Sequence, residues 1–218
     1  MLPTNIFYRT FFVRAAQYGT AFTLDIDGAE FLITARHLLG QLAGMHSLQV
    51  LRSGQWHKLD CEIVAVGRGE LDVAVLRAPT RLTDPDFAVD PKFGDCYVGQ
   101  DMFFVGFPYK MSVDYGPNAD GQPGVFLKKG TLSAVEAGPP KALYVDALNN
   151  EGFSGGPLYY FRNGNVNDPC IAGVVSKFKV EHEFVINAEG ETTEMKVPYN
   201  TGFLVAYDIA HALELARR

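Results

Sequence analysis

The stretch Gly152-Phe153-Ser154-Gly155-Gly156-Pro157 places one serine among three glycines, and four apolar residues, 158–161, follow it directly. Glycine accepts backbone conformations that are closed to other residues, so such a loop can turn main-chain amides toward a reacting atom. A serine in this setting is a candidate nucleophile, provided that a base lies next to its hydroxyl. The alternative is a glycine-rich turn between two strands that carries no chemistry.

The same residues also fit the Gly-x-Ser-x-Gly elbow of the α/β-hydrolases. That elbow leads directly into a helix, and its acid and histidine follow the serine in sequence. Here residues 158–161 have the composition of a strand, and the only histidines downstream are His182 and His211. A chain rich in strands does not match an α/β architecture either. We therefore reject the elbow interpretation.

The hydrophobic period along the chain is two, which indicates strands. Asp27-Gly28 and Ser53-Gly54 are turn signals between such segments. Strands are expected over residues 6–13, 18–26, 29–34, 48–51, 56–66, 71–76, 98–105, 125–135, 142–147, 171–180, 183–186, 194–197 and 203–205. Their regular recurrence predicts an all-β barrel or sandwich architecture.

Four other segments have distinct compositions. Residues 79–94 are rich in proline and aspartate and predict a linker between two β units. Residues 112–124, with several glycines and prolines, predict a long surface loop. Residues 181–194 are acidic and predict a solvated hairpin with its turn near 187–190. Residues 207–218 predict a helix, with an acid near its start and two arginines at its end.

Two upstream segments supply the partners that a serine nucleophile needs. Thr34-Ala35-Arg36-His37 places a histidine at the end of an expected strand. Asp72 leads the apolar run Val73-Ala74-Val75-Leu76, where a carboxylate is costly unless a donor meets it. The alternatives are a surface histidine and an exposed aspartate at a strand end.

These three segments, in this order, resemble the chymotrypsin/trypsin-like serine peptidases, and most closely their bacterial Deg-like branch without its PDZ domains. Four further segments resemble that branch, so the resemblance spans about residues 15 to 216: Gly19-Thr20-Ala21-Phe22, Gly106-Phe107-Pro108, Gly173-Val174-Val175-Ser176 and Thr201-Gly202-Phe203. The resemblance implies two antiparallel β-barrels with the active site between them. Residues 1–90 would form the barrel with the histidine and aspartate, 91–206 the barrel with the serine, and 207–218 the C-terminal helix of one peptidase domain.

The resemblance also implies a role for each catalytic residue. His37 would take the proton of Ser154 and return it to the leaving amine, while Asp72 holds the histidine tautomer. The backbone amides of Gly152 and Ser154 would form the oxyanion hole. Phe153 departs from the family, whose members carry an aspartate or asparagine before the serine, so activation by a newly cut N-terminus is not expected.

Substrate contacts follow from the same resemblance. Ser176, Lys177 and Phe178 would pair with the substrate backbone as an added strand. Gly202 would stand on the opposite wall of the specificity pocket, and Leu148 near its base. Because Leu148 is not a carboxylate, a Lys or Arg side chain would have no partner there. We expect cleavage after small or medium apolar residues.

Composition excludes other classes of function. The 218 residues include 19 Lys and Arg against 25 Asp and Glu, a net charge of −6, which argues against nucleic acid as a partner. Three separated cysteines, Cys61, Cys96 and Cys170, predict buried small residues rather than a disulfide framework. No metal-ligand set or cofactor motif is found.

The N-terminal residues lack a secretory signal, and no apolar run is long enough to span a membrane, so we expect a cytoplasmic protein.

The sequence therefore predicts a serine endopeptidase that acts on protein or peptide substrates through an acyl-enzyme. The rival hypothesis is a catalytically silent peptide-binding module of the same fold. An esterase is a third alternative, because acyl transfer to water is shared chemistry. No adaptor segment is recognised, so a regulatory or targeting protein chain is a further expected partner.

Overall fold

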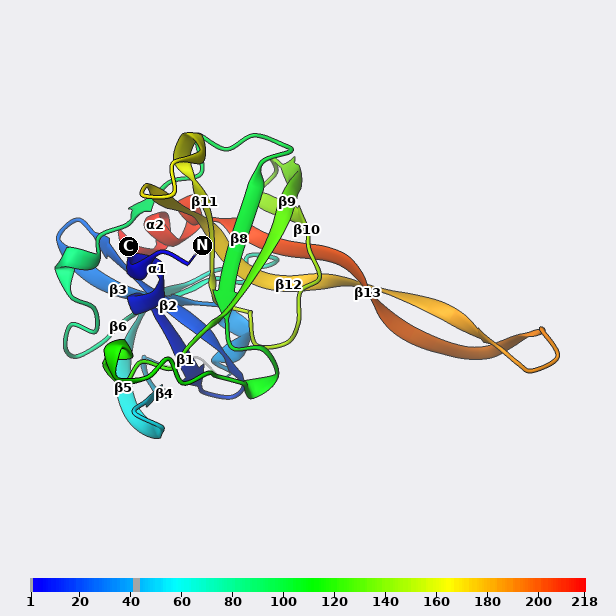
Figure 1. Ribbon diagram of the computed structural model, residues 1–218, viewed down its shortest axis with the longest axis horizontal. Helices are drawn as coiled ribbons and strands as arrows, with labels where there is room; N and C mark the ends of the chain where they lie inside the picture. The colour runs from blue at the N-terminus through cyan, green and yellow to red at the C-terminus, as the bar shows by residue number, and fades with distance from the viewer. Residues whose placement is uncertain (1, 41–43) are drawn as a thin grey trace.

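The computed structural model describes residues 2–40 and 44–218, and antiparallel strands make up most of it (Figure 1). The first six strands form a closed barrel in the order β1-β2-β3-β6-β5-β4. Closure gives each strand of the ring a neighbour on both sides. The strands are β1 (Thr10–Arg14), β2 (Tyr18–Ile26), β3 (Ala29–Thr34), β4 (Met45–Arg52), β5 (Gln55–Val66) and β6 (Ala74–Arg77).

The remaining strands form a second sheet in the order β11-β8-β9-β10-β13-β12-β7, and an additional β11–β12 pairing closes six of them into a ring. The two-barrel prediction is confirmed. The short β7 pairs with β12 in parallel, outside that ring. The strands are β7 (Asp90–Pro91), β8 (Asp101–Gly106), β9 (Phe126–Glu136), β10 (Ala142–Asp146), β11 (Pro157–Phe161), β12 (Pro169–Ile186) and β13 (Thr192–Asp208).

Each barrel buries a core of its own, and a third apolar cluster joins the two. Cys61 lies in the first core and Cys170 in the second, both fully buried, and all three cysteines are free thiols. In the joining cluster the rings of Phe12 and Phe107 stack with centroids 4.6 Å apart. Because this cluster draws residues from both barrels, it fixes one barrel against the other.

The C-terminal helix α2 (Ile209–Ala216) is confirmed, although it starts two residues later than predicted. Asp208 is its N-cap and accepts the amide of Ala210 at 2.9 Å. The buried face of the helix, Ile209, Ala212 and Leu215, packs into the joining cluster. Arg217 bonds to Asp27 in the turn between β2 and β3, so the last residues of the chain return to the first barrel.

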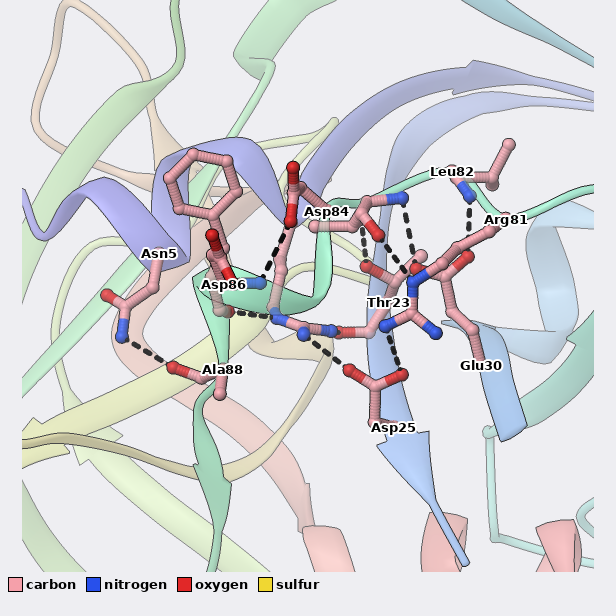
Figure 2. Close-up of polar contacts among 12 residues, drawn as sticks. Asn5, Thr23, Asp25, Glu30, Arg81, Leu82, Asp84, Asp86 and Ala88 are labelled. Atoms are coloured by element: carbon pink, nitrogen blue, oxygen red, sulfur yellow. Dashed lines mark hydrogen bonds and ion pairs between the residues drawn. The ribbon is translucent and has the colours of Figure 1, made fainter. Parts of the chain in front are cut away.

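The linker over 79–94 is held against the first barrel. It contains the 3₁₀ turn η2 (Pro85–Phe87) and β7. Figure 2 shows Asp25 facing Arg81 and Glu30 facing Leu82. Glu30 accepts the backbone amides of Leu82 and Thr83 at 2.6 and 3.0 Å. The buried Arg9 also bonds to Asp25, at 2.5 Å. Burial opposes ionisation of Asp25, but the hydrogen bonds from the two arginines outweigh it and lower its pKa.

Three local predictions are wrong. Residues 6–8 belong to a short helix, α1 (Thr4–Tyr8), in which Phe7 N–H bonds to Pro3 O; one helical turn is too short to show its period. Residues 71–73 precede β6 instead of forming its first half. The loop over 112–124 is not purely a surface loop, because Gln122 is buried and donates to Thr10 O in the first barrel. It includes the 3₁₀ turn η4 (Pro117–Ala119).

The acidic hairpin is confirmed, and it belongs to two continuous strands rather than to separate short ones. β12 and β13 run 18 and 17 residues, and their outer halves project from the barrels as a two-stranded ribbon (Figure 1). At its tip, Asn187 N–H bonds to Glu191 O, and Gly190 takes a positive φ of 84°. We call residues 179–200 the arm. Within the described residues, no helix is long and apolar enough to cross a membrane.

Candidate active site

The loop that carries Ser154 connects β10 to β11, and glycine is required on both sides of the serine. Gly152 has a φ of +100° and Gly155 a φ of +82°, in the region that side chains disfavour. A Cβ on Gly152 would lie 2.2 Å from Phe107 O, and one on Gly155 would lie 2.1 Å from Thr20 O. The glycines therefore let the loop pass against both barrels and present Ser154 between them.

Thr20 of β2 holds this loop from the first barrel. Its backbone N–H donates to Ser154 O at 2.9 Å, and its Oγ1 donates to Gly152 O at 2.7 Å. Thr34 Oγ1 in turn donates to Thr20 O at 2.7 Å. Thr20 and Thr34 are both buried. The loop that carries Ser154 in the second barrel is thus held in place by Thr20 of the first.

Phe153, the residue that departs from the family, is a core residue. Its ring is fully buried and packs edge-on against Phe104, with centroids 5.0 Å apart. Lys128 Nζ lies 5.4 Å from the centroid of the Phe153 ring. Phe153 thus anchors the loop through apolar packing in the core of the second barrel. An aspartate or asparagine at this position would rely on polar contacts instead.

His37 and Asp72 form a directly bonded pair. His37 lies in the 3₁₀ turn η1 (Arg36–Leu38) that follows β3, and its Nδ1 is 2.6 Å from Asp72 Oδ2. The backbone N–H of His37 donates to Asp72 Oδ1 at 2.9 Å, and Ser176 Oγ donates to Asp72 Oδ2 at 2.6 Å. With Nδ1 donating to this carboxylate, Nε2 is left as the acceptor that a general base needs.

The surroundings of Asp72 favour its ionised form. Burial alone would raise the pKa of Asp72, but the hydrogen bonds from His37 and Ser176 outweigh burial and lower it. An ionised carboxylate orients the imidazole and stabilises its protonated form.

Ser154 lies in the same cleft as His37. The cleft has a volume of about 1070 Å³, and residues of both barrels line it, including His37, Asp72, Gly152, Ser154, Ser176, Lys177 and Phe178. Ser154 Oγ donates to the carbonyl oxygen of Ser176 at 2.7 Å. A hydroxyl has one proton, so in this state it is not donated to His37. Catalytic hydrogen bonds of this kind often form only when substrate is bound.

Two backbone amides of the loop, on residues that line the cleft, have no protein acceptor among the described residues. A trans peptide group directs its carbonyl and its N–H to opposite sides. Glu151 O accepts from Tyr109 N–H and Phe153 O accepts from Gly156 N–H, both at 2.9 Å. The N–H groups of Gly152 and Ser154 therefore point away from those contacts, and within the described residues neither has a protein acceptor. Two such donors beside a nucleophile are suited to bind an oxyanion.

The structure brings together most of the residues that the sequence singled out, but not all. Leu148 and Gly202 do not line the cleft. Leu148 is 56% exposed, and its carbonyl oxygen accepts from Lys128 Nζ at 2.6 Å. Gly202 lies next to this segment, since its carbonyl accepts from Ala147 N–H at 2.8 Å. The two residues thus neighbour each other, outside the cleft that holds the serine and histidine.

Three contributing side chains were not anticipated in these roles: the hydroxyls of Ser176 and Thr20 and the ammonium of Lys128. Ser176 and Thr20 stand inside segments that carried the resemblance, so a signal for them existed. Lys128 lies on β9 with no motif around it. Among the described residues, no group of three or more His, Cys, Asp or Glu side chains is placed to hold a metal ion.

Comparison with known proteins gives a consistent family signal. A family model described as the trypsin-like peptidase domain matches residues 19–167, more than half of the chain. None of the curated proteins compared with the chain matches it.

Three similar solved structures are described as proteases. The inactive form of the Rv3671c protease of M. tuberculosis H37Rv is 16% identical, with a TM-score of 0.61 over 97% of this chain and 89% of that one. A serine endoprotease from Yersinia pestis is 17% identical, with a TM-score of 0.60 over 100% and 68%. An HtrA-type protease, AlgW, carrying a tripeptide is 18% identical, with a TM-score of 0.59 over 97% and 60%. At these identities the likeness establishes the shared fold.

Proposed function

Because the chain belongs to the trypsin-like peptidase family and is a serine protease, we propose that Ser154, His37 and Asp72 are its catalytic triad and that it cleaves internal peptide bonds. The observation that carries this proposal is the 2.6 Å contact between His37 Nδ1 and Asp72 Oδ2 on the rim of the cleft that Ser154 shares.

The reaction would begin when the Ser154 hydroxyl turns from Ser176 O toward His37 Nε2. His37 takes the proton while Oγ bonds to the substrate carbonyl carbon, and the amides of Gly152 and Ser154 bind the oxyanion. His37 then gives the proton to the amine of the leaving chain, and the C–N bond breaks to leave an ester on Ser154. Water, deprotonated by His37, hydrolyses that ester and restores the hydroxyl.

The same contacts suggest how substrate prepares the nucleophile. Ser176 O accepts the Ser154 hydroxyl, and it lies on the strand that would pair with the substrate main chain. A substrate N–H that bonds to Ser176 O would compete with Ser154 for this carbonyl. The displaced hydroxyl would then be available to His37, so the docked substrate would favour the reactive geometry.

Cleavage after small or medium apolar residues remains part of the proposal. Leu148 itself lies outside the cleft, but Lys128, which donates to Leu148 O, has its Nζ 5.4 Å from the ring of Phe153, the neighbour of Ser154. Its positive charge would disfavour a Lys or Arg side chain bound beside Ser154. Burial lowers the pKa of Lys128, but the contacts to Leu148 O and Asn150 Oδ1 suit its charged form. A peptide library that showed strong cleavage after Lys or Arg would overturn this specificity.

The test of the triad uses the purified full chain, a serine-reactive fluorophosphonate and a fluorogenic peptide library. We expect labelling at Ser154, found by mass spectrometry, and turnover that both Ser154→Ala and His37→Ala abolish. Ser133→Ala, at an exposed serine on β9, is the matched control and should retain both. Peptide binding without labelling or turnover would instead identify the silent peptide-binding module.

A further inference from the structure

Among the residues that the structure describes, one edge of β12 is unpaired from the cleft to the tip of the arm. Residues Pro169–Val174 pair with β11, and β13 pairs with the other edge of β12 from Gly173 onward. Beyond Val175, the edge of β12 that pairs with β11 closer to the barrel has no strand partner among the described residues. This open edge starts at Ser176, Lys177 and Phe178, which line the cleft, and it runs to Ile186. The register of β12 against β13 shifts at three points along it, between residues 175 and 177, 178 and 180, and 184 and 186.

The composition of the arm is unusual for a structure in water. A two-stranded ribbon by itself is only marginally stable. Apolar side chains on both strands are nevertheless exposed, including Phe184 at 52%, Ile186 at 65% and Met195 at 64%. An open edge flanked by apolar residues is a template for pairing with a further strand.

The charge of the arm limits which chain can pair with it. Residues 179–200 contain two lysines and five glutamates, so their net charge is 2 − 5 = −3. The whole chain carries −6. A second copy of the arm would therefore meet like charge, whereas a chain with lysine or arginine between its apolar residues would meet opposite charge.

We propose that the open edge of β12 in the arm binds the substrate chain on the amino-terminal side of the scissile bond, as a third, antiparallel strand. The preferred segments alternate apolar residues with lysine or arginine. This inference rests on the proposed peptidase function, because it extends the pairing at Ser176 and Phe178 outward. Over residues 179–186 the edge is about 26 Å long, at about 3.3 Å per strand residue.

Orientation makes the proposal specific. Antiparallel pairing places successive residues upstream of the scissile bond opposite successive residues of β12 toward Ile186. Residues downstream of the bond point away from the arm. The enzyme would therefore distinguish substrates by an extended segment before the bond, far outside the pocket that reads the residue at the bond itself.

The first test measures binding to the full chain with Ser154→Ala, so that no turnover is needed. Two fluorescent peptides share a central segment, and each is extended by about eight alternating valine and lysine residues, one upstream and one downstream. We expect the upstream extension to tighten binding by at least about tenfold over the unextended peptide, because added cross-strand pairs and hydrogen bonds accumulate. The downstream extension should add far less.

A shortened arm tests the surface itself. Glu181 and Tyr199 pair across the ribbon, so residues 182–198 can be replaced by an Asn-Gly turn without changing the register at its base. The measured quantity is the ratio of affinities for the extended and unextended peptides, with the thermal midpoint as a check of folding. The ratio should fall toward one. An unchanged ratio in a folded variant would overturn the proposal.

Charge provides a second variant that leaves the ribbon in place. Glu183→Lys in the arm should weaken binding of the basic extension by at least about threefold at low salt, and added salt should shrink the difference. Glu214→Lys, at another exposed glutamate, on α2, is the matched control and should leave binding as it is. If shortening the arm changes the oligomeric state in sedimentation and not the peptide ratio, a second copy is the partner and the proposal is wrong.

These measurements separate the two proposals. Arm-dependent binding without any Ser154-dependent cleavage would contradict the peptidase function and retain the docking surface. Cleavage whose kcat/KM is the same for both extensions, with and without the arm, would contradict the docking surface and retain the peptidase.

Discussion

Replacing Thr20 by valine tests whether the first barrel positions the nucleophile loop of the second. The substitution keeps the side-chain volume and the backbone N–H bond to Ser154 O, but it removes the hydroxyl that donates to Gly152 O at 2.7 Å. Gly152 O would keep only the long contact from Phe107 N–H at 3.5 Å. Thr20 is buried and Gly152 is half-buried, and leaving such an acceptor poorly satisfied costs about 1–3 kcal/mol.

That free energy can be lost from the fold, from the transition state, or from both. If the bond holds Gly152 N–H in place as an oxyanion donor, the whole amount appears in the barrier. Since about 1.4 kcal/mol is a factor of ten, kcat/KM should fall by about 5-fold to 150-fold.

The assay combines kcat/KM on a fluorogenic peptide with the free energy of unfolding from urea titration. Thr23→Val is the matched control, because Thr23 is also buried on β2 and its hydroxyl is 2.6 Å from Thr83 Oγ1, away from Ser154. The free energy of unfolding should fall in both variants. Only in Thr20→Val should kcat/KM fall by more than the loss of folded protein explains. Wild-type kcat/KM in Thr20→Val, or an equal loss in Thr23→Val, would refute the reasoning.

Three further outcomes are expected. The pKa of Asp72 is lowered in the fold, so its ionised form stabilises the protein above about pH 4, and this contribution is lost as the pH falls toward the lowered pKa. Asp72→Asn should therefore make the free energy of unfolding in urea depend less on pH on the acid side. An unchanged slope would contradict this. Gly152→Ala forces a Cβ to within 2.2 Å of Phe107 O at a positive φ, so fluorophosphonate labelling should disappear while circular dichroism keeps its β signal, and normal labelling would count against the loop geometry. Burial raises the pKa of Cys61 and of Cys96 to about 12, so iodoacetamide at pH 8 should modify them slowly in the native chain and rapidly in urea. Equal rates of modification in the two conditions would contradict this prediction.

Much of the fold, and the residues that we propose as the triad, could be predicted because local sequence carries them. Period-two segments and turn signals mark the strands, and His37, Asp72 and Ser154 each stand in a short motif beside a strand. Longer-range contacts left no such mark. The hydroxyl of Ser176 meets Asp72 across 104 positions, and Thr20 meets Gly152 across 132. Only the folded chain shows that these groups act on the site.

The specificity region and the arm show two other limits. Counting back from Ser154 places Leu148 along the chain, but not how deep its side chain lies, and the structure leaves it 56% exposed. In the arm, lysine and glutamate interrupt the apolar alternation, so the sequence indicates short strands on either side of a turn. Backbone pairing nevertheless continues through these charged positions, as at Glu181 and Tyr199.

The place of β13 in the second ring has a consequence for the order in which the protein is made. The first barrel closes with residues 10–77 alone, whereas β13 stands between β10 and β12 and reaches residue 208. During translation, the first barrel, which includes His37 and Asp72, can therefore emerge and fold long before the ring that supports Ser154 can close. The proposed peptide-cleaving ability should arise only after residue 208 has left the ribosome, which spares the nascent chain and its neighbours from attack before both barrels are complete.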